Sequence, residues 1–155
     1  MNQIFSLFLL ILFSCNMDNP NNTNSITQDS NEINAINKIL IEQQKCWNKG
    51  DIEGFMQGYW NSEELIFTSL SHKPAYGWKN TLERYKNSYP TKESMGLLKF
   101  QILELQLNSE KTAALKGKWE LIRENDHPYG MFWLDLKKFE ENWLIIKDST
   151  ISLIN

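Results

Sequence analysis

The chain has 155 residues, of which 41% are hydrophobic and 23% charged, and its formal net charge is -3. This balance is typical of one globular domain with a sizeable core, and the lack of a Lys/Arg-rich block argues against a nucleic-acid partner. Aromatic residues reach 12% and include six Trp. Such side chains bury large areas and often carry a polar tip that needs a partner.

The N-terminus has the pattern of a secretory signal. Residues 4–13, IFSLFLLILF, are apolar apart from Ser6, and the run is shorter than the roughly 20 residues that span a bilayer. The following LFSC at 12–15 resembles the lipobox of bacterial lipoproteins, in which the Cys becomes the lipidated first residue. We therefore expect a signal peptide over 1–15, lipidation at Cys15, and a location in the bacterial cell envelope.

One feature departs from the pattern of such signals. No Lys or Arg precedes the apolar run, as it would in most such signals, so a buried N-terminal strand or helix is the alternative. Residues 16–31 are polar and rich in Asn, which predicts a flexible tether between the lipid anchor and a folded domain over 32–155. With Cys15 lipidated, Cys46 has no partner for a disulfide, and we expect it to be a buried, inert thiol.

Helical spacing predicts three helices in the first half of the domain. The first begins with a cap at Ser30 or Asn31 and ends at Gly50, and Asp51 caps the second. The third begins at Trp78 and ends before Pro90.

Strand patterns dominate the second half. A short strand at 65–70 and a loop at 71–77 separate the second and third helices, and the alternating segments beyond Pro90 are 97–107, 111–123, 131–139 and 143–151. The first of these alternates imperfectly, which indicates a bulge. Helices followed by an antiparallel meander predict an α+β domain, with a curved antiparallel sheet packed on three N-terminal helices and a pocket at the open end.

This order of elements resembles the nuclear transport factor 2-like superfamily, which includes SnoaL-like cyclases and ketosteroid isomerases. The wording of four segments is similar to a bacterial SnoaL-like branch: ILIEQQKCWNKGDIEGFMQGYW, GWKNTLERYKNSYP, LKGKWELIREND and NWLIIKDST. The resemblance covers about residues 32–152 and implies a cone-shaped fold. It does not select a function, because one such fold serves enzymes and binders alike. Members of this branch often carry Asp-His-Thr or Asp-His-Ser on the last strand, and Ser149 stands where they have His.

Six residues are candidates for ligand binding. Tyr59 and Trp78 lie at helix ends, Tyr85 shares a helix face with Trp78, and Trp119 and Arg123 continue a core-directed strand face. The sixth is Asp148 on the last strand. For the aromatic residues, ordinary core packing is the alternative to lining a pocket.

Arg123 and Asp148 leave a choice open. An inward-facing Asp148 without a cation would have a raised pKa that suits a general base, whereas an ion pair with Arg123 would be structural. Arg123 could also meet an acidic or carbonyl-bearing ligand, or lie in solvent. His72 and His127 stand in predicted loops without further ligands at metal spacing, so we expect no metal. No phosphate loop, Ser-centred elbow or dinucleotide fingerprint occurs, so we expect no cofactor.

Three functions follow as alternatives. The first is a lipid-anchored envelope protein that binds a small apolar or carbonyl-bearing molecule. The second is a cofactor-free isomerase, cyclase or dehydratase with Asp148 as proton acceptor and Tyr59 as donor. The third is a dimerising interaction module, for which Trp133 and Trp143 would suit the outer face of the sheet if they point away from the helices.

Overall fold

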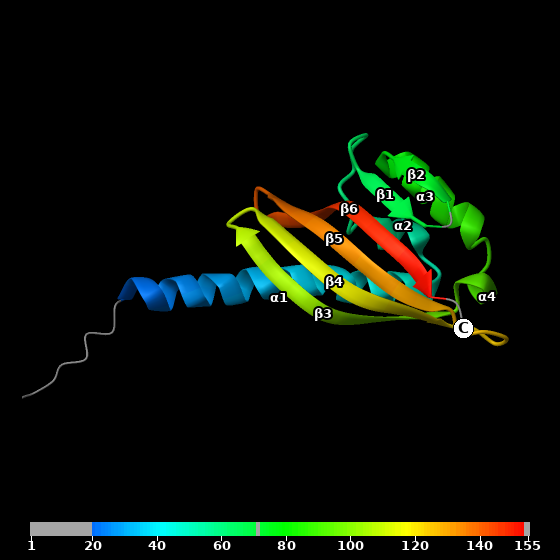
Figure 1. Cartoon of the computed structure of the whole chain (residues 1–155), viewed down its shortest axis with the longest axis horizontal. Coiled ribbons are helices and arrows are strands. Elements are labelled where there is room, and N and C mark those ends of the chain that lie inside the picture. The colour runs from blue at the N-terminus through cyan, green and yellow to red at the C-terminus, as the bar shows by residue number, and fades with distance from the viewer. Residues whose placement is uncertain (1–19, 71, 154–155) are drawn as a thin grey trace, which may run out of the picture.

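A computed structural model describes residues 20–70 and 72–153 (Figure 1). The helices in this part of the chain are α1 (Pro20–Lys49), α2 (Ile52–Met56), α3 (Trp78–Ser88) and α4 (Lys92–Met95). The strands are β1 (Ile66–Ser69), β2 (His72–Tyr76), β3 (Leu97–Ser109), β4 (Thr112–Ile122), β5 (Tyr129–Phe139) and β6 (Asn142–Leu153). This is the expected α+β architecture.

The strands form one sheet in the order β2-β1-β6-β5-β4-β3. Successive strands from β3 to β6 pair antiparallel, whereas β1 pairs parallel to β6. Figure 1 shows β3 to β6 as long twisted ribbons with α1 running along one face, and α3 beside β1 and β2. The sheet therefore has a covered inner face and an open outer face.

The core lies between α1 and the inner face of the sheet. Ile36, Leu40 and Trp47 of α1 are buried at helical spacing, and the buried residues of β4 and β5 recur at every second position, as in a half-buried strand. Asp51 caps α2 as expected, because its Oδ1 accepts a 2.7 Å hydrogen bond from the Gly54 amide.

The first helix begins earlier than the sequence indicated. It starts at Pro20 rather than at Ser30 or Asn31, so part of the segment expected to be a flexible tether is helical. Proline suits the first turn of a helix because the amide hydrogen that it lacks has no partner there. The expected signal peptide, Cys15 and residues 16–19 lie outside the described residues. Within the described ranges, no helix is long and apolar enough to cross a membrane.

Two short elements differ from the prediction. Residues 71–77 were expected to form a loop, but His72–Tyr76 forms β2 at the edge of the sheet, where Pro74 does not interrupt a central ladder. The short helix α4 follows Thr91, whose side chain and that of Ser94 form a reciprocal cap. The bulge expected in the strand beginning at residue 97 is present, because the register of β3 shifts between Ile102 and Glu104.

A second bulge, in β6, sets the direction of the last strand's side chains. Leu136 pairs with Ile145 and Asp135 pairs with Lys147, so Ile146 is an extra residue on β6. Each extra residue in a strand shifts the alternation of side chains by one position. Consequently Ile145 faces the core before the bulge, and Asp148 faces the same side after it.

The two tryptophans assigned to the outer face of the sheet differ in exposure. Trp133 is 40% exposed, with Lys116 Nζ 6.0 Å from its ring centroid. Trp143 is buried, and its Nε1 donates a 2.6 Å hydrogen bond to the Glu32 carboxylate on α1. The expectation that Trp143 contributes to an outer surface is therefore wrong. Before the bulge, the side chains of Trp143 and Ile145 point to the same, inner face of the sheet.

Candidate functional site

A cavity of about 340 Å³ lies between the inner face of the sheet and the helices α1 and α3. Its wall is mostly aromatic and aliphatic, with a few polar groups, which is the composition of a small-molecule site. Ser88 at the end of α3 and Ser152 near the end of β6 belong to this wall and are exposed. The cavity therefore opens between the C-terminal ends of α3 and β6.

The chain after α2 is fastened to β6, and this fixes Tyr59. The Trp60 amide donates to the Ile145 carbonyl and the Ile145 amide donates to the Gly58 carbonyl, both at 2.9 Å. Tyr59 itself forms a parallel bridge with Ile145. Its ring is 4% exposed, so the phenol is carried by buried backbone rather than by a mobile loop.

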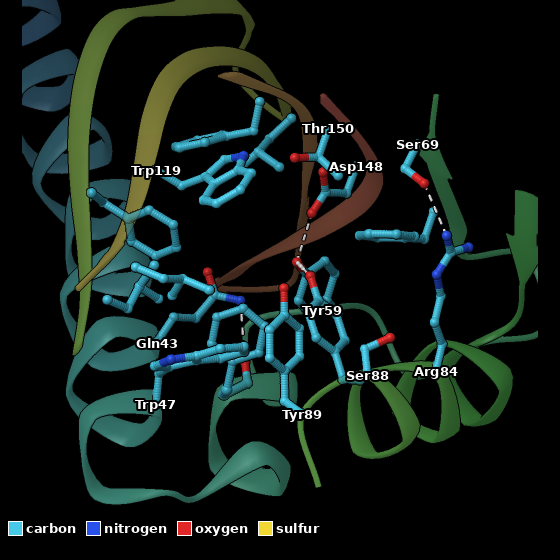
Figure 2. Close-up of a pocket in the computed structure, with 18 of the residues that line it drawn as sticks. Gln43, Trp47, Tyr59, Ser69, Arg84, Ser88, Tyr89, Trp119, Asp148 and Thr150 are labelled. Carbon is cyan, nitrogen blue, oxygen red and sulfur yellow. Dashed lines mark hydrogen bonds between the residues drawn. The ribbon is translucent and has the colours of Figure 1, made fainter. Parts of the chain in front are cut away.

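Tyr59 and Asp148 meet at the polar end of the cavity (Figure 2). The Tyr59 hydroxyl donates a 2.7 Å hydrogen bond to Oδ2 of Asp148. The Tyr85 hydroxyl lies 3.3 Å from the Tyr59 hydroxyl and extends the chain of polar groups to α3. Asp148 is 5% exposed, and no Lys or Arg pairs with it among the described residues.

Burial dominates the acid–base behaviour of this cluster. It raises the pKa of Asp148 to about 7, although the hydrogen bond from Tyr59 acts in the opposite direction. Burial and the nearby Asp148 raise the pKa of both Tyr59 and Tyr85 well above the usual tyrosine range. Near neutral pH, Asp148 therefore changes its charge while the two phenols keep their protons.

Two polar atoms on this wall lack partners. Within the described part of the chain, neither Oδ1 of Asp148 nor Nε1 of Trp119 makes a hydrogen bond, and both atoms are buried. A buried donor or acceptor without a partner costs about 1–3 kcal/mol, so such atoms are uncommon in folded proteins. One is an acceptor when Asp148 is ionised and the other is a donor.

The remaining wall is a cluster of rings in edge-to-face contact. Trp47, Phe55, Phe67 and Tyr89 all lie within 6.4 Å of a neighbouring ring centroid and all line the cavity. Phe55 belongs to the core and also reaches the cavity. Trp47, Phe67 and Tyr89 were not among the six candidates, because apolar periodicity does not separate core from pocket wall.

Arg123 lies on the wall but is neutralised locally. Its Nε and Nη2 atoms form a bidentate pair with the Asp126 carboxylate at 2.5 and 2.6 Å, and Nη1 donates to the Ser94 carbonyl. The structure therefore does not pair Arg123 with Asp148. The sequence did contain a sign of this ion pair, because Asp126 lies three residues after Arg123 in the turn that follows β4.

Of the six candidates, the structure brings five to one cavity: Tyr59, Tyr85, Trp119, Arg123 and Asp148. Trp78 is not among the lining residues. Its indole Nε1 donates a 3.0 Å hydrogen bond to the Met56 carbonyl, which ties α3 to α2.

Arg84 is a cavity residue that the sequence pattern did not single out. Its guanidinium donates to the Lys73 carbonyl and to the Ser69 hydroxyl, both at 2.9 Å, and lies 4.8 Å from the Phe67 ring centroid. Helical spacing contained the signal, since Arg84 lies one turn before Ser88 and one turn after Thr81 on α3.

Metal-binding groups are not apparent in the described ranges, where no three His, Cys, Asp or Glu side chains cluster. His127 is exposed in the turn between β4 and β5, as expected. Cys46 is a free, half-buried thiol.

No protein-family model and no curated protein matches the chain. Solved structures do. A nuclear-transport-factor-2-like protein of unknown function from Shewanella oneidensis is 40% identical, with a TM-score of 0.74 over 77% of this chain and 98% of that one. A ketosteroid isomerase-like protein from Erwinia carotovora is 15% identical, with a TM-score of 0.66 over 80% and 98%. A putative scytalone dehydratase from Novosphingobium aromaticivorans is 14% identical, with a TM-score of 0.63 over 83% and 89%.

Proposed function

The chain belongs to the nuclear transport factor 2-like superfamily, and from the geometry of its cavity we propose that it is a cofactor-free enzyme that transfers a proton on a small, mostly apolar molecule. The observation that carries the proposal is the environment of Asp148. The carboxyl group is buried, has no cation beside it, and accepts a hydrogen bond from Tyr59 through only one oxygen. A carboxylate with a pKa near neutrality is suited to general base catalysis.

Each polar group has a role in this proposal. Asp148 takes a proton from a carbon next to a carbonyl group and returns it at another position, or the resulting anion expels a leaving group. Tyr59 fixes the carboxylate by donating its one hydroxyl proton to Oδ2. The Tyr85 hydroxyl, 3.3 Å from that of Tyr59, can turn to donate its proton to the oxygen that gains charge. The aromatic wall excludes water and binds the apolar part of the substrate. Isomerisation, cyclisation and dehydration all fit this chemistry.

The test is exchange of α-protons for deuterium in a panel of cyclic ketones and enones, followed by NMR in deuterated buffer. We expect the protein to accelerate exchange on at least one member, and Asp148→Asn to remove the acceleration by a factor of about 100 or more. Asp135→Asn is the matched control, because Asp135 is an exposed carboxylate on the neighbouring strand β5. Equal rates for the unmodified protein and Asp148→Asn would refute the proposed base.

Binding without chemistry is the second candidate, and one observation favours it. Asp148 Oδ1 and Trp119 Nε1 are an acceptor and a donor without partners in the described chain, and a ligand that hydrogen-bonds to them would be held without any reaction. Native mass spectrometry of the purified protein distinguishes the two functions. A carrier would retain a ligand unchanged through purification, whereas an enzyme would convert the added compound.

We further propose that the protein is lipidated at Cys15 and acts at the cell envelope. The support is the apolar run at 4–13 and the LFSC segment in the sequence. Labelling with a radioactive fatty acid should mark the wild-type protein but not the Cys15→Ser variant. Labelling of both proteins would contradict the lipid anchor.

A homodimer through the outer face is also proposed. The support is Trp133, which is 40% exposed, with the half-buried Met131 and Ile151 beside it on the paired strands β5 and β6. Sedimentation of Trp133→Glu should give a monomer where the unmodified protein gives a dimer. A monomeric unmodified protein would dispose of this proposal.

A further inference from the structure

Arg84 is a half-buried cation on the cavity wall that pairs with no carboxylate among the described residues. Its contacts in the described chain are the Lys73 carbonyl, the Ser69 hydroxyl and the Phe67 ring. None of the ion pairs found there includes it. Removing a charge from water without an opposite charge nearby is unfavourable, so this arrangement favours the binding of an anion.

Arg123 differs from Arg84 in having a carboxylate partner. Both guanidinium groups line the same cavity, but Asp126 neutralises Arg123 through two hydrogen bonds. Arg84 has no corresponding carboxylate in the described residues. Any negative charge on a ligand is therefore better met at Arg84 than at Arg123.

The Arg84 side chain is also held in place before a ligand arrives. Ser69 and Lys73 anchor it on the β1–β2 side, and its guanidinium carbon lies 4.8 Å from the Phe67 ring centroid. Figure 2 shows the hydrogen bond between Arg84 and Ser69. A guanidinium has five N–H donors, and the two hydrogen bonds observed leave donors for a ligand. A purely structural link between α3 and β1 would account for these two bonds but not for the uncompensated charge.

Arg84 and Asp148 differ in their burial on the cavity wall. Arg84 is half-buried on α3, one turn before the exposed Ser88, and Asp148 is buried on β6. The charge of Arg84 reaches the Tyr85 hydroxyl, where it favours the ionised form. Asp148 has no such cation beside it, so a second negative charge is disfavoured deeper in the cavity.

We infer that Arg84 binds an anionic group of the ligand, so that the ligand is a small apolar acid with a carboxylate or a similar oxyanion at the open end of the cavity. This inference rests on the proposed function in that it names the class of molecule bound at the same site. The apolar body of the ligand then lies along the aromatic wall, and its reactive carbon faces Asp148. Arg84 binds and orients, and takes no part in the proton transfer.

The test compares two nearly isosteric probes, 2-naphthoate and 2-naphthamide, by isothermal titration calorimetry. They share the same rings and differ in one negative charge. We expect the unmodified protein to bind the carboxylate about tenfold more tightly than the amide or better, as a charge-assisted, bidentate contact predicts. This comparison needs no variant, and equal affinities would overturn the inference.

Variants then assign the preference to Arg84. Arg84→Met should abolish the preference for 2-naphthoate, and Arg84→Lys should retain part of it. Lys79→Met removes the same charge from an exposed position on the same helix and should leave the preference unchanged. A preference that survives Arg84→Met, or disappears in Lys79→Met, would contradict a specific role of Arg84.

The outcome is separable from that of the proposed function. Asp148→Asn should still prefer 2-naphthoate, because the anion is held at Arg84 and not at Asp148. A protein that shows the preference without catalysing exchange would support the anion site and contradict the catalytic base. A protein that catalyses exchange with equal affinity for both probes would do the reverse.

Discussion

Ile145 and Asp148 stand three positions apart on β6, yet both side chains point to the inner face of the sheet. Strict alternation would place them on opposite faces. The extra residue Ile146 at the bulge accounts for the difference, since Leu136 pairs with Ile145 and Leu134 with Asp148. The position of this bulge therefore decides whether the cavity contains a carboxylate.

The first prediction concerns stability and pH. The folded state raises the pKa of Asp148 to about 7, above the unfolded value of about 3.9. Between these values the folded state binds more protons, so its stability falls as pH rises. Relative to Asp148→Asn, we expect the free energy of unfolding to fall by a few kcal/mol between about pH 4 and pH 8, because each tenfold difference in proton affinity between the folded and unfolded states contributes about 1.4 kcal/mol.

Urea denaturation followed by tryptophan fluorescence at several pH values measures this difference. Asp135→Asn, which changes an exposed carboxylate, serves as the control and should track the unmodified protein. A difference between the unmodified protein and Asp148→Asn that stays constant with pH would show that Asp148 ionises normally.

The second prediction concerns the hydrogen bond between Tyr59 and Asp148. This bond lowers the pKa of the carboxyl group against the effect of burial, because it stabilises the ionised form. Tyr59→Phe should therefore raise the pKa of Asp148 further, by about one pH unit for a bond worth about 1.4 kcal/mol. A carbon-13 NMR titration of the Asp148 carboxyl group gives the value directly.

The matched control for this change is Tyr129→Phe, which removes an exposed hydroxyl from β5. It should leave the titration of Asp148 where it was. A lower or unaltered pKa in Tyr59→Phe would mean that the 2.7 Å contact does not persist in solution.

The third prediction concerns the shape of the cavity. A Cβ atom on Gly117 would overlap the Phe132 ring and lie 2.9 Å from the Gln101 carbonyl. Gly117→Ala should therefore push Phe132 into the cavity and destabilise the protein by about 1–3 kcal/mol. Binding of 2-naphthoate and 2-naphthamide should weaken together, since the wall moves but the charge at Arg84 does not. Lys118→Ala, an exposed change on the same strand, should affect neither stability nor binding.

The fourth prediction concerns the docking of α1 on the sheet. Glu32 accepts hydrogen bonds from Trp143 Nε1 at 2.6 Å and from Lys138 Nζ at 2.7 Å. Glu32→Ala should lower the free energy of unfolding by about 1–3 kcal/mol, because it leaves the buried Trp143 indole without an acceptor.

Glu42→Ala is the comparison for this helix. Its pair with Lys45 is exposed on both sides, and such pairs contribute about 0–1 kcal/mol. Equal losses for the two variants in urea denaturation would argue against the Glu32 contact as a clamp between α1 and β6.

Much of this fold follows from local patterns in the sequence. Helical spacing predicted α2 with its cap at Asp51, and alternation predicted β4 and β5 to within a few residues. Tyr59 and Asp148 were paired as donor and acceptor, and their hydroxyl and carboxylate do meet. These features depend on neighbours in the chain or on one long-range strand pairing.

The parts that were missed depend on contacts that spacing does not encode. Nothing in residues 143–151 fixes where β6 bulges, so the inward turn of Trp143 was not foreseen. For Arg123, a pair with the distant Asp148 was one of three alternatives, and the nearby Asp126 was not considered. Arg84 was not singled out, because its place on the wall depends on how α3 packs beside β1 and β2.

The bulge at Ile146 also makes β6 a strand of two independent halves. Trp143 and Ile145 pack the first half into the core, and Asp148, Thr150 and Ser152 place polar groups of the second half on the cavity wall. Because the bulge sets the direction of the side chains in each half separately, substitutions after Ile146 can change the polar groups of the cavity without disturbing the packing of the first half. Divergence of activity on this scaffold would then proceed at little cost to folding, within a segment of a few codons.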